Sequence, residues 1–121
     1  MAVLRIVPNR AANDPERTAA FYRALFDLDV AMDMGWIVAL SGAQQSIQIS
    51  FATQGGSGTP VPDLSIEVED LDAVLERAAA LGLRPDYGPV NEPWGVRRFY
   101  LRDPDGTLLN VLSHQTEDRT D

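Results

Sequence analysis

Cysteine is absent from the chain of 121 residues. Its absence excludes disulfide bonds, thiolate metal sites and a cysteine nucleophile. Long apolar runs are also missing, because no segment approaches the ~20 residues that a membrane-spanning helix needs. The N-terminal sequence "MAVLRIVPNR" has no signal-peptide hydrophobic region. We therefore predict a soluble cytoplasmic protein that does not enter a membrane.

Basic residues are scarce, at 10 against 18 acidic residues, and the net charge is −8. A nucleic-acid partner is disfavoured, because phosphate contacts need a basic surface. Anionic membranes are disfavoured for the same reason. The charge favours a cationic or neutral small molecule, although acidity can also serve solubility alone. With 45% hydrophobic residues, the chain can bury a substantial core.

The order of the predicted elements repeats, which indicates a duplicated βαβββ unit. The first unit, residues 1–52, begins with a strand at 3–9. A helix then starts at Asn13 or Asp14, whose side chain can cap it, with Pro15 in the first turn. Three strands follow. The helix is predicted to bury an apolar stripe made of Phe21, Ala24, Leu25 and Leu28.

Residues 53–60, "TQGGSGTP", predict a flexible linker. The second unit, 61–113, repeats the pattern, and a polar tail, 114–121, follows it. Its helix is capped by Asp70 and ends at Gly82. The turn "DPDG" joins the last two strands, and we assign its residues Asp103 and Asp105 to turn formation. The stripe predicted for this helix contains Leu71, Val74, Leu75 and Ala78.

One helix can cover only one face of the sheet in each unit. We therefore predict an α+β fold in which tandem βαβββ repeats form a curved eight-stranded mixed sheet, a half-barrel, around a cleft. Strand alternation decides which side chains face that cleft. Asn110 is a polar residue in an otherwise aliphatic strand, and it can contact a ligand, Gln48 or a buried water. The cleft side is predicted to carry Arg5, Val7, Asn9, Ser46, Gln48, Ser50, Asp63, Ser65, Glu67, Leu108, Asn110 and Leu112.

Several side chains in these strands have chemistry of their own. Arg97 and Arg98 are consecutive, so alternation sends one of them to each face and leaves open which one faces the cleft. Trp36 lies on a central strand, where a core role is the alternative, whereas Trp94 lies on a loop that can form the mouth of a pocket. An inward arginine can clamp an anion or pair with an acidic residue such as Glu67.

The segments "DPERTAAFYRALFDLDV" and "PWGVRRFYLRDPDGTLLNVL" resemble the vicinal oxygen chelate superfamily, in particular its glyoxalase/bleomycin-resistance branch. The resemblance covers nearly the whole chain. It implies a homodimer, which exposed sheet edges and apolar helix flanks also favour. It also implies four positions that hold a divalent ion in the metal-dependent members. These positions are occupied here by Val7, Gln48, Asp63 and Asn110.

This set departs from the histidine, glutamate and glutamine residues usual in metal-dependent members. A catalytic ion typically needs about three strong protein ligands. Val7 cannot be a ligand, and the chain has a single histidine, His114. We therefore expect no cofactor, and a divalent metal is the alternative. Asp63 and Glu67 are weak candidates for a general base.

The predicted function is binding of a small molecule, with sequestration of a cationic or aromatic compound without a metal. The resistance proteins of the resembling group take up a drug in this way. The alternative is a glyoxalase-type lyase or isomerase, or a dioxygenase, acting on a vicinal dioxygen substrate. The predicted ligand-binding residues are Val7, Trp36, Gln48, Asp63, Glu67, Trp94, Arg98 and Asn110.

Overall fold

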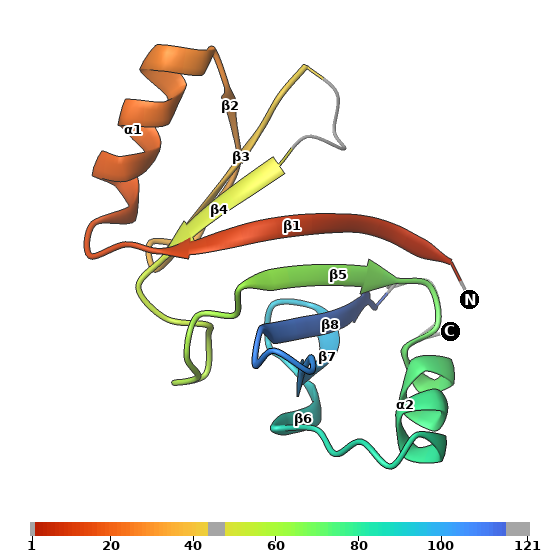
Figure 1. Ribbon diagram of the computed structural model, residues 1–121. Coiled ribbons are helices and arrows are strands. Elements are labelled where there is room, and N and C mark those ends of the chain that lie inside the picture. Colours follow the sequence, from red (N-terminus) through yellow and green to blue (C-terminus); the bar gives the residue numbers. More distant parts are fainter. Residues whose placement is uncertain (1, 44–47, 116–121) are drawn as a thin grey trace. The chain divides into compact units, whose positions relative to one another are not determined.

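The computed structural model describes residues 2–43 and 48–115. The start of the strand predicted at 45–52 and most of the predicted tail lie outside these residues. The elements, shown in Figure 1, are β1 (Val3–Ala11), α1 (Pro15–Phe26), β2 (Asp29–Asp33), β3 (Ile37–Ser41), β4 (Gln48–Ala52), β5 (Leu64–Val68), α2 (Leu71–Ala80), β6 (Tyr87–Asn91), β7 (Val96–Arg102) and β8 (Leu108–His114). No helix among the described residues is long and apolar enough to span a membrane.

The strand order is β2-β3-β4-β1-β5-β8-β7-β6. β1 pairs with β4 in parallel, and the β2–β3, β3–β4, β6–β7 and β7–β8 pairs are antiparallel. The sheet is therefore mixed, as expected when a helix connects the first strand of a unit to later ones. The predicted α+β class, with tandem βαβββ repeats and an eight-stranded mixed sheet, is confirmed.

The chain divides into two compact units. Ile6–Leu64 forms one, called the N-unit, and Met1–Arg5 with Ser65–Asp121 forms the other, called the C-unit. β1 contributes to both. In the C-unit, the Glu69 amide donates to the carbonyl of Ala2 (3.0 Å), and in the N-unit the Asn9 amide donates to the carbonyl of Asp63 (3.0 Å).

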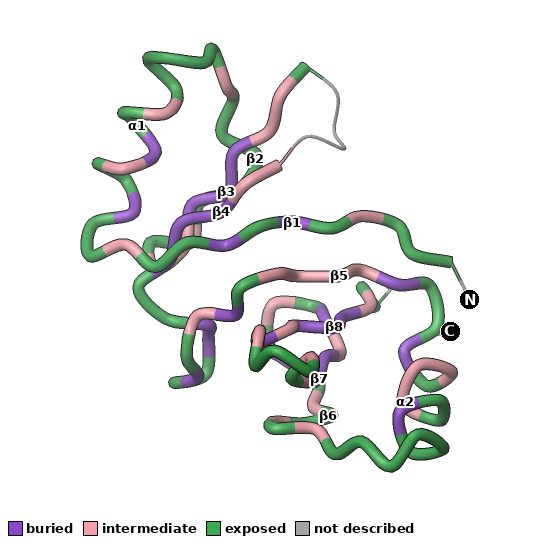
Figure 2. The backbone as a smooth tube through the Cα atoms, in the orientation of Figure 1, coloured by how far each residue is buried: buried purple, intermediate pink, exposed green. Residues whose placement is uncertain are grey.

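Helix α1 begins as predicted but buries a different face. Asp14 is its N-cap, and the Asp14 side chain accepts a hydrogen bond from the Arg17 amide (3.2 Å). The buried side contains Pro15 and Ala19, and Tyr22 packs beside them, whereas Figure 2 shows most of the helix exposed. The predicted stripe was wrong: Phe21 and Leu25 are each 61% exposed, and of the four residues Leu28 packs on the core cluster.

The physical reason is that α1 carries two apolar stripes. Ala19 and Tyr22 meet the cluster of Val38, Leu40 and Phe51, and the small alanine leaves room for the helix to approach the strands. The Tyr22 and Phe51 ring centroids lie 4.7 Å apart, within the range of a favourable aromatic contact.

Helix α2 follows its prediction. Asp70 is the N-cap and accepts from the Ala73 amide (3.2 Å). Leu71 and Ala78 are buried in the C-unit, and Val74 and Leu75 pack on the core cluster of Val68, Leu71, Phe99 and Val111. Gly82 has φ +76°, where a glycine avoids strain.

One of two connecting segments agrees with its prediction, and the other differs from it. In the turn after β7, the Asp103 side chain accepts from the amides of Asp105 and Thr107 (2.9 Å each), so its predicted structural role is confirmed. Residues 53–60 form hydrogen-bonded turns rather than an open linker. The Gly55 amide donates to Thr59 (2.7 Å), because the glycines supply positive φ angles that close tight turns.

Candidate functional site

The C-unit sheet has two faces with different chemistry. The face toward α2 is apolar, with Phe99, Leu101, Leu109 and Val111 among its residues. Residues directly opposite one another in antiparallel strands share a face, and Tyr100 pairs with Asn110, Arg98 with Leu112 and Val96 with His114. The other face, called the distal face, therefore carries Ser65, Glu67, Val96, Arg98, Tyr100, Leu108, Asn110, Leu112 and His114.

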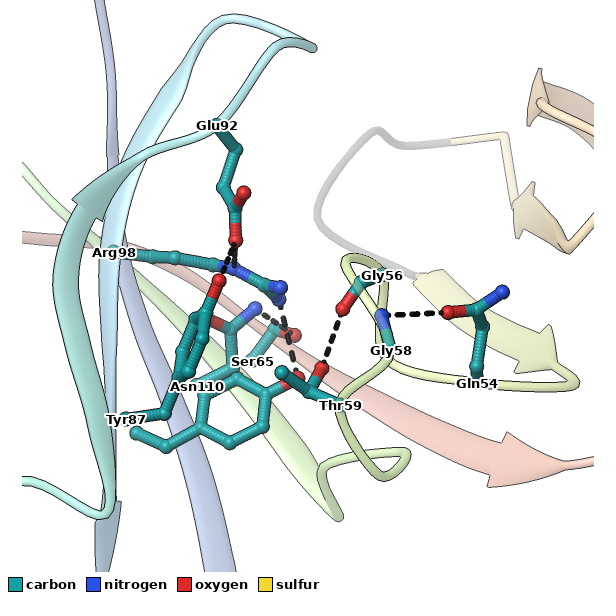
Figure 3. A network of polar contacts seen from close by, with 10 residues as sticks. Gln54, Gly56, Gly58, Thr59, Ser65, Tyr87, Glu92, Arg98 and Asn110 are labelled. Carbon is teal, nitrogen blue, oxygen red and sulfur yellow. Dashed lines mark hydrogen bonds and ion pairs between the residues drawn. The ribbon is translucent and has the colours of Figure 1, made fainter.

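Arg98 forms a buried ion pair on the distal face. Its Nε donates to Oε2 of Glu92 (2.7 Å), and both side chains are only 3% exposed. The Tyr87 hydroxyl donates to the same oxygen (2.8 Å), and Arg98 donates through a terminal nitrogen to the Tyr100 hydroxyl (3.1 Å). Figure 3 shows the Glu92 carboxylate between the Arg98 side chain and the Tyr87 hydroxyl. A buried pair of this kind needs several partners, because water no longer solvates either charge.

Aromatic rings complete the surroundings of Arg98. Its guanidinium carbon lies 5.0 Å from the ring centroids of Trp94 and Tyr100 and 5.4 Å from that of Tyr87. These distances are those of cation–π contacts. Tyr87, Glu92, Trp94, Arg98 and Tyr100 are called the Arg98 cluster. Its aromatic faces and its carboxylate already hold a cation of the protein itself.

Arg97 points the other way. It pairs with Ser113 in the register, on the α2 side, and forms an ion pair with Asp72 on α2 (3.5 Å). The structure therefore settles the alternative that the sequence left open. Arg98 faces away from the helix, and Arg97 faces toward it.

Asn110 holds the one side-chain polar atom in the described part of the chain that is buried without a hydrogen-bond partner, its Oδ1. Its amide nitrogen donates to the Ser65 hydroxyl (3.0 Å), and the residue is 9% exposed. A buried acceptor without a partner costs about 1–3 kcal/mol. A molecule that donates a hydrogen bond there would offset that cost.

Glu67 lies between two basic groups. Its Oε1 accepts from Nε of Arg5 (2.5 Å), and its Oε2 contacts Nδ1 of His114 (2.6 Å). Burial acts to raise the pKa of Glu67, but the hydrogen bonds from His114 and Arg5, with their charges, outweigh it, so the pKa is lowered. Glu67 is consequently held as a carboxylate, which makes it a weak proton acceptor.

The eight predicted ligand-binding residues are divided between the units. Val7 is buried, Trp36 and Gln48 are half-buried, and Asp63 is exposed, all in the N-unit. In the C-unit, Trp94 and Arg98 are brought together in the Arg98 cluster, whereas Asn110 contacts Ser65. Glu67 forms hydrogen bonds with Arg5 and His114.

The four positions that correspond to a metal site have a poor donor set. Val7 has no ligand atom, Gln48 and Asn110 offer neutral amides, and Asp63 alone offers a carboxylate. Across the described residues, no group of three or more His, Cys, Asp or Glu side chains could hold an ion. These residues do not fit a catalytic divalent cation, which prefers imidazoles and carboxylates.

Sequence reasoning missed the roles of Glu92 in the Arg98 cluster and of His114 on the distal face. Glu92 follows β6 in a turn in which its amide donates to Val96 (2.7 Å), and that turn brings its carboxylate to Arg98. His114 was noted only as a lone histidine. Alternation placed Glu67 on the distal face, but its pairing with His114 depends on the β5–β8 neighbourhood.

Comparison with known proteins agrees with this architecture. A bleomycin resistance protein from Klebsiella pneumoniae is 26% identical over 117 residues, covering 89% of this chain and 90% of that protein. A glyoxalase/bleomycin resistance protein/dioxygenase superfamily member from Vibrio splendidus 12B01 has a TM-score of 0.63 at 17% identity, covering 93% of this chain and 99% of that chain.

Methylmalonyl-CoA epimerase from Mycobacterium tuberculosis has a TM-score of 0.67 at 15% identity, covering 98% of this chain and 91% of that chain. At these identities the solved structures show a shared fold. The family model for this fold matches residues 5–111, and the chain belongs to the Glyoxalase/Bleomycin resistance protein/Dioxygenase superfamily.

Proposed function

We propose that the protein binds a small organic molecule at Asn110 on the distal face of the C-unit, without a metal. The observation that carries this proposal is the buried, unpartnered Oδ1 of Asn110. Leu108 and Leu112 flank it on β8 and are buried. Apolar walls with one convergent polar group are typical of ligand sites.

The contacts of the distal face define the ligand chemistry. The ligand should present an N–H or O–H donor to Asn110 and an apolar or aromatic surface to the leucines. The net charge of −8 favours cations at long range. Locally, however, the carboxylates of Glu67 and Glu92 are paired with Arg5 and Arg98, so neutral and cationic donors are both expected to bind.

Bleomycin is the first probe to use, because the Klebsiella relative is a bleomycin resistance protein. Isothermal titration with metal-free bleomycin and with a panel of aromatic amines tests the proposal. We expect Asn110→Leu to weaken binding about two- to tenfold, since a net hydrogen bond is worth about 0.5–1.5 kcal/mol.

Asn91→Leu is the matched control. Asn91 pairs with Arg97 and so lies on the α2 side of the sheet, where it is exposed. The Asn91→Leu variant should bind each ligand with the affinity of the wild type. Binding by Asn110→Leu at wild-type strength, or no binding of any panel member by the wild type, would overturn the proposal.

Self-association is the second part of the proposal. Exposed apolar side chains gather on two N-unit elements, Phe21, Leu25 and Phe26 on α1 and Val30 and Met32 on β2. β2 is also an edge strand. Exposed apolar groups beside an open sheet edge favour a homodimer, which buries both.

A further inference from the structure

The only imidazole of the chain is held in a fixed position by a carboxylate. Nδ1 of His114 lies 2.6 Å from Oε2 of Glu67, and Nε of Arg5 binds the other oxygen of Glu67. We propose that Glu67 and His114 form a proton-transfer dyad that helps water add to activated carbonyl compounds, such as activated esters. This activity goes beyond binding and does not require Asn110.

The contact with Glu67 decides which ring nitrogen carries the proton. An ionised carboxylate is only an acceptor, so Nδ1 must be the donor. The lone pair of the neutral ring is then on Nε2, the arrangement in which an imidazole accepts a proton from a substrate or water. Glu67 therefore acts as a positioning residue, and His114 as the proton acceptor.

Arg5 keeps the carboxylate in this role. Each oxygen of Glu67 has its own partner, Arg5 at Oε1 and His114 at Oε2, so the carboxylate cannot turn without losing a hydrogen bond. The Glu67 side chain is 13% exposed. Its mostly buried position and two fixed partners restrict the orientation of the imidazole.

The imidazole is accessible. The His114 side chain is 50% exposed, and Nε2 has no hydrogen-bond partner among the described residues. Half of the side chain is open to solvent, and we expect water and a small ester to reach Nε2. Oriented general bases of this kind typically contribute about 10²–10⁴-fold to a rate.

The proposed reaction is the hydrolysis of an ester by one water molecule. Water gives a proton to Nε2 while its oxygen bonds to the carbonyl carbon, and the carbonyl electron pair moves to the oxygen. The tetrahedral adduct then re-forms the carbonyl and expels the alcohol, which takes the proton from Nε2. Ester and water yield carboxylic acid and alcohol, and nothing is oxidised or reduced.

Hydrolysis of p-nitrophenyl acetate by the full chain tests the activity. We expect the wild type to exceed free imidazole at equal concentration by about tenfold or more. His114→Gln should lower the rate to the buffer background. The double variant H114Q/Q115H moves the only imidazole one residue along, away from Glu67, and should react no faster than free imidazole.

Nuclear magnetic resonance of the ring nitrogens tests the positioning separately. One histidine gives one set of signals, and we expect the wild-type neutral ring to be protonated at Nδ1. Glu67→Gln should shift the ring toward Nε2 protonation and lower the esterase rate about tenfold. A His114→Gln rate equal to the wild type, or a wild-type ring protonated at Nε2, would refute the dyad.

Discussion

At the scale of single residues, two arginine–carboxylate ion pairs of the C-unit differ in their burial. Arg98 and Glu92 are buried within the Arg98 cluster, whereas Arg102 and Asp86 lie at the surface, with Nε to Oδ2 at 2.8 Å. The two ion pairs have similar N–O distances but are expected to contribute differently to the free energy of unfolding. The buried pair cannot be broken without stranding a charge, whereas water replaces the lost partner at the surface.

We expect Glu92→Gln to lower the free energy of unfolding by about 3–5 kcal/mol, because the Arg98 guanidinium would stay buried without its counter-charge. Asp86→Asn is the matched control and should cost less than about 1 kcal/mol. Urea denaturation of both variants measures the difference. Equal losses would contradict the importance of burial at Arg98.

The lowered pKa of Glu67 makes the free energy of unfolding depend on pH. The folded-state pKa lies below the ordinary value of 4.5, so the unfolded chain binds the proton first on acidification. The stability from Glu67 is present above pH 4.5 and is lost as the pH falls through the folded-state pKa.

The test compares the unfolding free energy of the wild type with that of Glu67→Gln on both sides of pH 4.5. The wild-type advantage should be largest above this pH and should shrink below it. A gap that grows on acidification would mean that Arg5 and His114 do not stabilise the carboxylate.

At the scale of elements, the two helices differ although both begin at an aspartate cap. α2 buries the stripe that its sequence pattern indicates. α1 leaves Phe21 and Leu25 exposed and uses Ala19 and Tyr22 instead. An exposed apolar stripe on a helix beside an edge strand is the feature that a second copy would cover.

We expect Leu25→Glu to convert a wild-type dimer to a monomer, because a charge would be buried at the proposed interface. Leu81→Glu is the matched control, since Leu81 is also an exposed leucine but lies at the end of α2 in the C-unit. Light scattering after gel filtration gives the mass of each. A monomeric wild type, or dissociation by Leu81→Glu alone, would count against this interface.

At the scale of the whole molecule, two similar βαβββ units carry unequal chemistry. The distal face of the C-unit gathers charged and aromatic groups that are paired with one another. The positions related to metal ligands carry a valine, two amides and one exposed aspartate. We infer that this member of the superfamily functions without a bound divalent ion.

Elemental analysis of protein purified without chelators tests that inference. We expect no stoichiometric nickel, zinc, iron or manganese, because the available donors are too few and too weak. Stoichiometric metal would instead support the glyoxalase-type lyase, isomerase or dioxygenase alternative. Added zinc should leave the thermal midpoint nearly unchanged, since only a tightly bound ion stabilises the fold.

Local patterns predicted a large part of the fold and some of the site. The caps at Asp14 and Asp70 follow from short-range chemistry and were found. Alternation placed Glu67 on the side away from α2, because side chains in a strand change face at every residue. Asn110 was placed there by its alignment with Gln48 of the first repeat. The partner of Arg98 was not found, because Glu92 lies outside the strands, in the turn between β6 and β7, where strand alternation predicts nothing.

The sequence by itself determined the order of elements, the duplicated units and the apolar faces of β4 and β5, since these depend on neighbours a few residues apart. Tertiary structure alone decided which stripe of α1 is buried, which carboxylate meets Arg98 and that His114 contacts Glu67. Those outcomes join residues up to 47 positions apart, and only the packing and register of the strands bring such residues together.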